Sequence, residues 1–144
     1  MFERRPKQRA PPVGDAWVDP ANYKVVIRGQ WKRREHVNVL EGRASLQALR
    51  RAARNRSSWN KKMLGITDSQ VIQGAFAKGR CSSFSLLRLC RRAAAIQMGL
   101  GIRLKWRYIR SKDNPADGPS RGRKVPGSLP PGAWTWKGHY DERR

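Results

Sequence analysis

Three short stretches of this chain have the composition of β-strands, and the segments between them have the spacing of helices. The strand-like stretches are residues 23–31, 63–67 and 102–109, where β-branched, aromatic and other apolar residues predominate. Gly29 interrupts the first of them. Alternation of this kind favours folds in which helices pack on the faces of a sheet.

Three helices are predicted from the spacing of apolar residues. The first covers residues 38–56, where Leu46, Leu49 and Ala53 share one face and arginines occupy the others. The second covers residues 69–78 and stops at Gly79. The third covers residues 83–98, and its expected apolar stripe consists of Leu87, Cys90, Ala94 and Met98.

The order of these elements predicts an α/β fold, a mixed sheet flanked by helices. Residues 22–121 are the expected domain. Residues 1–21 are rich in Pro and Arg, which predicts a flexible arm. Residues 122–144 form a Gly/Pro-rich tail in which Trp134 and Trp136 could anchor on a neighbouring surface.

The charge of the chain indicates what it binds. Its 144 residues carry a formal charge of +22, from 32 Lys and Arg against 10 Asp and Glu. Such an excess of positive charge favours binding to a polyanion such as DNA or RNA. A basic disordered tail or a ribosomal-type protein has a similar composition. No apolar run is long enough to span a membrane, and residues 1–6 lack the apolar core of a secretory signal. We therefore expect an intracellular protein, nuclear or cytoplasmic, with no membrane partner.

The two cysteines argue against a zinc site, because they have no second pair and no nearby histidine. Cys90 lies in a leucine-rich segment, and we expect it to be a buried, reduced thiol.

Acidic residues are rare in the expected domain. Between residues 40 and 120 they are Glu41, Asp68, Asp113 and Asp117, each near the start or end of a predicted element. Strand ends and helix starts gather at one edge of an α/β sheet, so Glu41, Asp68 and Asp117 can converge there. Convergent carboxylates in a basic protein need a cation, and Mg²⁺ held by carboxylates can support phosphodiester hydrolysis.

Each of these acids also has a purely structural explanation. Residues 38–41 (NVLE) match a capping box with Asn38 in the cap position. Asp68 could be the N-cap of the helix over 69–78. Asn114 could cap a helical turn that has Pro115 in its first position and leads to Asp117.

Four sequence blocks follow one another in a distinctive order. They are residues 36–44 (HVNVLEGRA), 66–69 (ITDS), 78–83 (KGRCSS) and 112–121 (KDNPADGPSR). The blocks resemble the ribonuclease H domain of retrotransposon reverse transcriptases, those of DIRS-like elements most closely. The resemblance covers about residues 22–121, and NPADGPSR is its most specific part.

The resemblance implies a ribonuclease H-like fold, dependence on Mg²⁺ or Mn²⁺, and endonucleolytic hydrolysis of the RNA strand of RNA–DNA hybrids. It also implies, as a partner, the polymerase part of a larger polyprotein. Glu41, Asp68 and Asp117 fall on three of the family's four metal-binding, catalytic acids, and Asn114 falls on a nearby motif asparagine.

The chain departs from the family pattern in two places. The family's first acid lies on an opening strand, in a D-A-S motif followed by a β-hairpin. Asp15 begins the similar D-A-W, with Asp19 as an alternative, but the 25 residues between Asp15 and Glu41 leave only an incomplete hairpin. Tyr108 stands where many of these enzymes carry a mobile histidine, so product release or metal handling could be impaired.

Basic residues complete the expected site. Seven Lys or Arg and no acid lie between Gly42 and Thr67. We expect nucleic-acid contacts from Arg43, Arg50, Lys78, Arg80, Arg88 and Asn114, a solvated helix face being the alternative. Three functions remain open: an active ribonuclease H, a catalytically inactive retroelement fragment that binds nucleic acid, and a basic ribosome- or chromatin-associated protein whose acids are not clustered.

Overall fold

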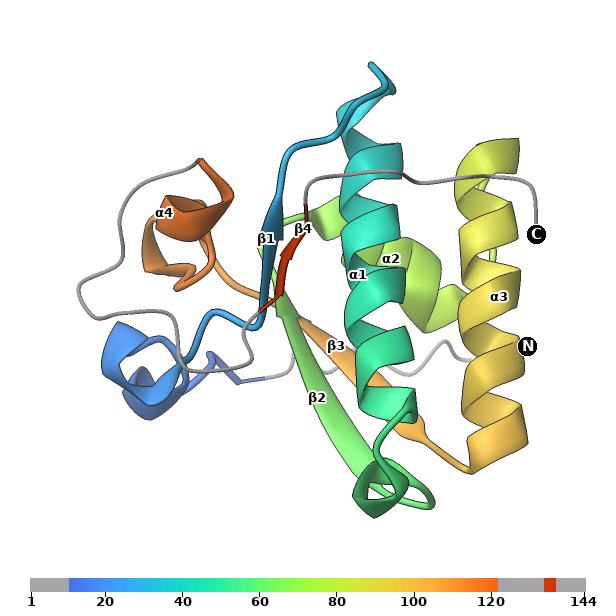
Figure 1. The fold of residues 1–144 in the computed structure, drawn as a ribbon, viewed down its shortest axis with the longest axis horizontal. Helices are drawn as coiled ribbons and strands as arrows, with labels where there is room; N and C mark the ends of the chain where they lie inside the picture. Colours follow the sequence, from blue (N-terminus) through green and yellow to red (C-terminus); the bar gives the residue numbers. More distant parts are fainter. Residues whose placement is uncertain (1–10, 122–133, 137–144) are drawn as a thin grey trace, which may run out of the picture.

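The computed structural model describes residues 11–121 and the backbone of residues 134–136. The main elements of the described chain are α1 (Val37–Ala53), β2 (Lys62–Thr67), α2 (Gln70–Lys78), α3 (Phe84–Leu100) and β3 (Arg103–Tyr108) (Figure 1). The shorter elements are β1 (Ile27–Gly29), α4 (Asp117–Ser120), β4 (Trp134–Trp136) and 3-10 turns at Asp15–Trp17, Pro20–Asn22, Arg56–Ser58 and Ser111–Asp113.

The central pair of strands is parallel. β2 pairs with β3 in register from Lys62 opposite Arg103 to Thr67 opposite Tyr108. Parallel neighbours need a crossover, and α2 and α3 supply it. β1 and β4 form a separate parallel pair. The predicted α/β class is confirmed as helices around a small parallel sheet, while no described strand pair is antiparallel, as a mixed sheet would require.

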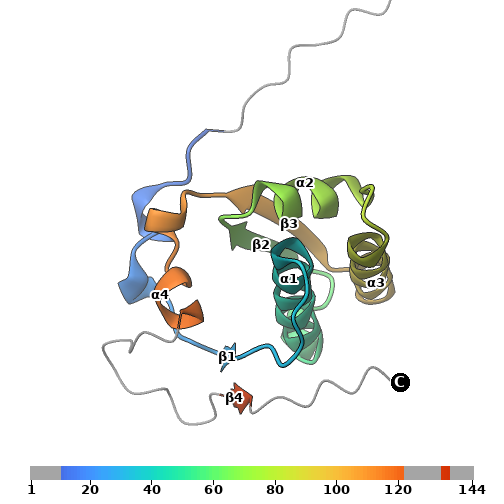
Figure 2. The same ribbon diagram turned by 90° about the horizontal axis from the view of Figure 1, so that it is seen from above.

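The core lies among the three long helices. The most deeply buried large side chains are Leu46 of α1, Ile72 of α2 and Leu86 of α3. Leu49 is also buried and Ala53 is partly buried, which confirms the predicted face of α1. Figure 2 shows the helices side by side, with α3 at the edge of the molecule farthest from α4.

The buried face of α3 differs from the predicted stripe. Cys90 is buried as expected, but Met98 is 84% exposed and Ala94 is exposed. The buried residues are Leu86, Leu89, Cys90 and Ala93. Both sets have helical spacing, and contact with α1 selects between them, because Leu86 and Leu89 lie over Gly42.

Glycines end two of the helices. Gly79 follows α2 in the left-handed conformation (φ 66°), as predicted. α3 runs on to Leu100, beyond its predicted end, and stops at Gly101 (φ 64°). No described helix is both long enough and apolar enough to cross a membrane.

The part of the chain before α1 contains little regular structure. Residues 11–21 of the predicted arm form parts of two 3-10 turns, and the Tyr23 hydroxyl donates a hydrogen bond to the Trp17 carbonyl. The strand predicted over 23–31 is reduced to Ile27–Gly29, and it pairs with β4 rather than in a hairpin. Of the predicted tail, residues 122–133 and 137–144 lie outside the described residues.

Candidate functional site

Each of the three acids singled out from the sequence lies near the start of a helix or directly after a strand. α1 and β2 run in opposite directions, and α1 starts well above the point where β2 and β3 finish in the view of Figure 1. Glu41 lies near the start of α1, Asp68 follows β2 directly, and Asp117 is the first residue of α4. The backbone of Ile109 donates to the Thr67 carbonyl over 3.0 Å, so the exits of the two strands are adjacent.

The three acids do not form a metal site. Within the described ranges, no three His, Cys, Asp or Glu side chains are grouped so that they could hold a metal ion. Asp117 is instead paired with a cation, because Arg121 Nε donates to its Oδ1 over 2.9 Å. As positioned, the acids do not fit a bound Mg²⁺ or Mn²⁺.

The structural explanations for two of the acids are wrong. His36 is the N-cap of α1, and its Nδ1 accepts from the Asn38 backbone over 3.2 Å, so Asn38 and Glu41 do not form a capping box. Ser69 caps α2, its Oγ accepting from Ile72 N over 3.3 Å. The carboxylates of Glu41 and Asp68 are therefore not used as caps, and neither has a hydrogen bond to another described residue.

The NPAD segment forms a compact turn. Asn114 Oδ1 accepts from Ala116 N over 3.0 Å, and the Asn114 carbonyl accepts from Asp117 N over 3.0 Å. The capping role considered for Asn114 is thus correct for this turn, whereas the N-cap of α4 itself is Ala116. Asn114 thus fixes the turn that leads to Asp117.

The chain matches no family model. No curated protein and no solved structure is significantly similar to it. The resemblance to retroelement ribonuclease H domains therefore depends on the four sequence blocks alone.

The candidates for a first acid are not placed on an opening strand. Asp15 begins a 3-10 turn and is exposed. Asp19 accepts from Ala21 N over 2.9 Å and caps the next turn. Prolines at positions 11, 12 and 20 remove backbone donors that a central strand would need.

One predicted nucleic-acid contact is engaged within the protein. Arg43 donates to both carboxylate oxygens of Glu35, over 2.6 and 2.9 Å. The hydrogen bond from Arg43 is the main cause that lowers the pKa of Glu35 below its ordinary 4.5. The sequence pattern does not reveal this pair, because Glu35 precedes α1 and lies eight residues away, outside the spacing of helix neighbours.

Other cations remain open to solvent. Lys78, Arg80 and Arg88 are exposed as expected, whereas Arg50 is half-buried and has contacts within the protein. Several exposed cations have side chains without a hydrogen bond or ion pair to any described residue: Lys62, Lys78, Arg80, Arg88, Arg91, Arg92, Arg103 and Lys105. These residues lie on α3, on both central strands, and at the end of α2 and just after it.

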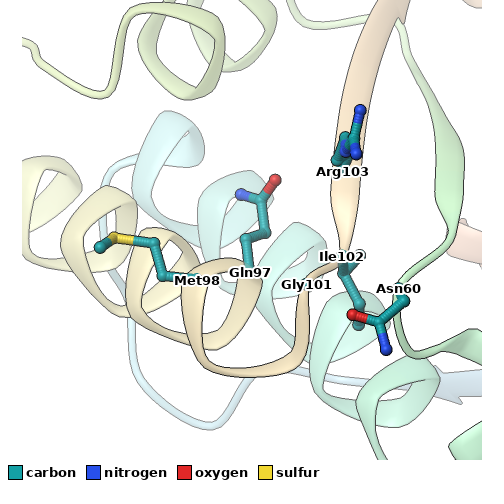
Figure 3. Close-up of a pocket in the computed structure, with 6 residues that line it drawn as sticks. All are labelled: Asn60, Gln97, Met98, Gly101, Ile102 and Arg103. Atoms are coloured by element: carbon teal, nitrogen blue, oxygen red, sulfur yellow. The ribbon is translucent and has the colours of Figure 1, made fainter.

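A cavity of about 300 Å³ lies where α3 turns into β3, at the other end of β3 from the acids (Figure 3). Its lining residues are Asn60, Gln97, Met98, Gly101, Ile102 and Arg103. Gln97 Oε1 accepts from Leu104 N over 3.0 Å, so this amide holds the start of β3. The lining contains no Asp, Glu, His or Cys. It therefore lacks the usual general acids and bases for hydrolysis.

Proposed function

We propose that this chain binds nucleic acid through its basic surface and is a ribonuclease H-like domain related to retroelement reverse transcriptases. The observation that carries the binding proposal is the set of exposed Lys and Arg side chains without partners among the described residues. A formal charge of +22 destabilises a compact chain through self-repulsion unless anions neutralise it. A nucleic-acid backbone supplies such charges at close, regular spacing.

Support for the ribonuclease H-like relationship comes from the order of elements around the motif blocks. α1 carries the HVNVLEGRA block, β2 leads into ITDS, and β3 leads into KDNPADGPSR. In this proposal, the domain would act beside the polymerase part of a larger polyprotein, in the nucleus or cytoplasm.

The binding test is fluorescence anisotropy with labelled single-stranded DNA, duplex DNA and an RNA–DNA hybrid over a series of salt concentrations. We expect binding whose affinity falls linearly with salt on a log–log plot. Polyglutamate serves as the control, because it has the charge of a polyanion without phosphates or bases. No binding to any nucleic acid, or equal affinity for polyglutamate, would reject the proposal.

Hydrolysis of the RNA strand of an RNA–DNA hybrid is the second candidate function. The observation that favours it is that Asp68 and the segment leading to Asp117 follow adjacent strand ends, and that Glu41 and Asp68 have no hydrogen-bond partner among the described residues. Because these acids do not form a metal site as positioned, they supply no cleavage mechanism in this arrangement.

The test of this candidate is cleavage of a hybrid labelled on its RNA strand, with MgCl₂ or MnCl₂ and with a chelator as the blank. This candidate requires that wild type cleaves, that Asp68→Asn abolishes cleavage, and that Asp113→Asn retains it as the matched acid outside the set. If wild type binds the hybrid and leaves it intact, the inactive binding protein is the correct description.

A further inference from the structure

The outward face of α3 has an unusual composition. Its residues, here called the α3 stripe, are Phe84, Arg88, Arg91, Arg92 and Met98. They recur at helical spacing on the side opposite the buried Leu86, Leu89, Cys90 and Ala93, and all are exposed, Phe84 by 69%. At about 1.5 Å per residue the stripe extends roughly 21 Å. In both ribbon views α3 lies at the side of the molecule away from α4 (Figure 2).

The centre of the stripe is a cluster of uncompensated positive charge. α3 contains no acidic residue. The side chains of Arg88, Arg91 and Arg92 make no hydrogen bond or ion pair with any described residue. Like charges at this spacing destabilise a helix by a few tenths of a kcal/mol per pair, about 0.2–0.5. A row of phosphates would remove that repulsion.

Apolar side chains lie at both ends of the positive cluster. Phe84 precedes Arg88 by one helical turn, and Met98 follows Arg92 toward the cavity at the start of β3, which Arg103 also lines (Figure 3). A nucleic-acid duplex presents phosphates outward but keeps its bases stacked inside. A single strand presents phosphates together with the flat faces of bases, on which aromatic side chains stack.

We propose that the α3 stripe binds single-stranded nucleic acid, with Arg88, Arg91 and Arg92 on successive phosphates and Phe84 stacked on a base. This inference rests on the proposed nucleic-acid binding and assigns it to one face and one class of ligand. Met98 and the cavity beside it extend the surface in the direction of Arg103.

The first experiment removes the charges. The full chain carrying Arg88→Gln, Arg91→Gln and Arg92→Gln is compared with a control carrying Lys24→Gln, Lys32→Gln and Arg34→Gln, which lowers the net charge equally at exposed positions before α1. The probes are a labelled oligothymidylate and a DNA duplex of equal length. We expect the stripe variant to lose at least about tenfold in affinity for the oligothymidylate, and its salt slope to fall by about 2, because each phosphate contact on a single strand contributes about 0.7.

The second experiment removes the aromatic ring. Phe84→Ala is compared with Val71→Ala, an exposed apolar residue on α2. We expect Phe84→Ala to weaken oligothymidylate binding by about tenfold, in line with the loss of one base stack, and to leave duplex binding unchanged. A 2-aminopurine probe should show a fluorescence change with wild type and with Val71→Ala that is absent with Phe84→Ala.

The outcomes separate this inference from the function on which it rests. If wild type binds no nucleic acid, both fail. If wild type binds but the stripe variant and the control lose affinity equally, only the α3 assignment fails. A duplex bound as tightly as the single strand, with Phe84→Ala indistinguishable from wild type, would overturn the choice of ligand. Circular dichroism melts establish that each variant is folded.

Discussion

Gly42 of α1 and Leu86 of α3 are in such close contact that a β-carbon on residue 42 would lie 2.7 Å from the Leu86 Cδ1 atom. Leu89 Cδ1 would be 3.1 Å from the same β-carbon. The two helices therefore pack at a distance that only glycine permits without movement of these leucines.

Replacing Gly42 with a larger residue should destabilise the fold. We expect Gly42→Val to lower the free energy of unfolding by about 1–3 kcal/mol, because the added methyl groups overpack the contact with Leu86 and Leu89. Gly74 of α2 is the matched control, since a β-carbon there meets nothing within 4 Å. Gly74→Ala should stabilise by roughly 0.5–1 kcal/mol through helix propensity. Urea denaturation measures both, and a neutral Gly42→Val would contradict the packing described.

The two left-handed glycines should differ in their tolerance of alanine. Gly79 and Gly101 have nearly the same φ, 66° and 64°, but a β-carbon on Gly79 meets open space while one on Gly101 would collide with the Asn60 side chain. We expect Gly79→Ala to cost about 1 kcal/mol from backbone strain and Gly101→Ala to cost more. The difference in thermal unfolding between the two variants isolates the contact with Asn60. Equal losses would show that Asn60 moves aside freely.

The ion pair between Glu35 and Arg43 should make stability depend on pH in the acid range. Arg43 donates hydrogen bonds to the carboxylate, which lowers the pKa of Glu35 below 4.5 in the folded protein. Its contribution, about 0.5–1 kcal/mol for a two-point pair near the surface, is therefore full above pH 4.5 and disappears as the pH falls through the lowered pKa.

The measurement is the difference in unfolding free energy between wild type and Glu35→Gln. It should be present at neutral pH and shrink at an acid pH below 4.5, where the lowered pKa of Glu35 is crossed. Asp113→Asn is the control, because Asp113 is exposed and its carboxylate has no described partner, so the corresponding difference should be small at both pH values.

The two cysteines should differ in reactivity. Burial, with a smaller effect from neighbouring Cys81, raises the pKa of Cys90 to about 11. The reactive thiolate is therefore scarce at Cys90 at neutral pH. We expect iodoacetamide to alkylate the partly exposed Cys81 in the folded protein and to reach Cys90 only after denaturant is added. Mass spectrometry of wild type and Cys81→Ser gives the result, and rapid labelling of folded Cys81→Ser would show that Cys90 is accessible.

Local sequence patterns were sufficient for the main helices and strands. Leu46 and Leu49 identify the buried face of α1, and Gly79 identifies the end of α2, because these signals depend on neighbours within a few residues. Apolar composition also identifies β2 and β3. Neighbouring parallel strands of an α/β fold end at the same edge of the sheet, which explains why Asp68 and the segment before Asp117 follow adjacent strand ends.

Features that depend on distant contacts were not predictable in the same way. The choice of Leu86 and Leu89 over Leu87 and Met98 as the buried residues of α3 is decided by Gly42, far away in sequence. The pairing of Asp117 with Arg121 removes one acid from the expected set, and several residue types could have capped α1 in place of His36. Whether Glu41, Asp68 and Asp117 act together remains a prediction.

The parallel pairing of β2 with β3 has a consequence for the chain as it leaves the ribosome. Thr67 completes β2, but its partner strand begins only at Arg103, after both crossover helices. At about 5–20 residues per second, synthesis of the intervening segment takes roughly two to seven seconds. During that interval β2 is translated without its hydrogen-bonding neighbour, and chaperones that recognise extended apolar segments have time to bind it.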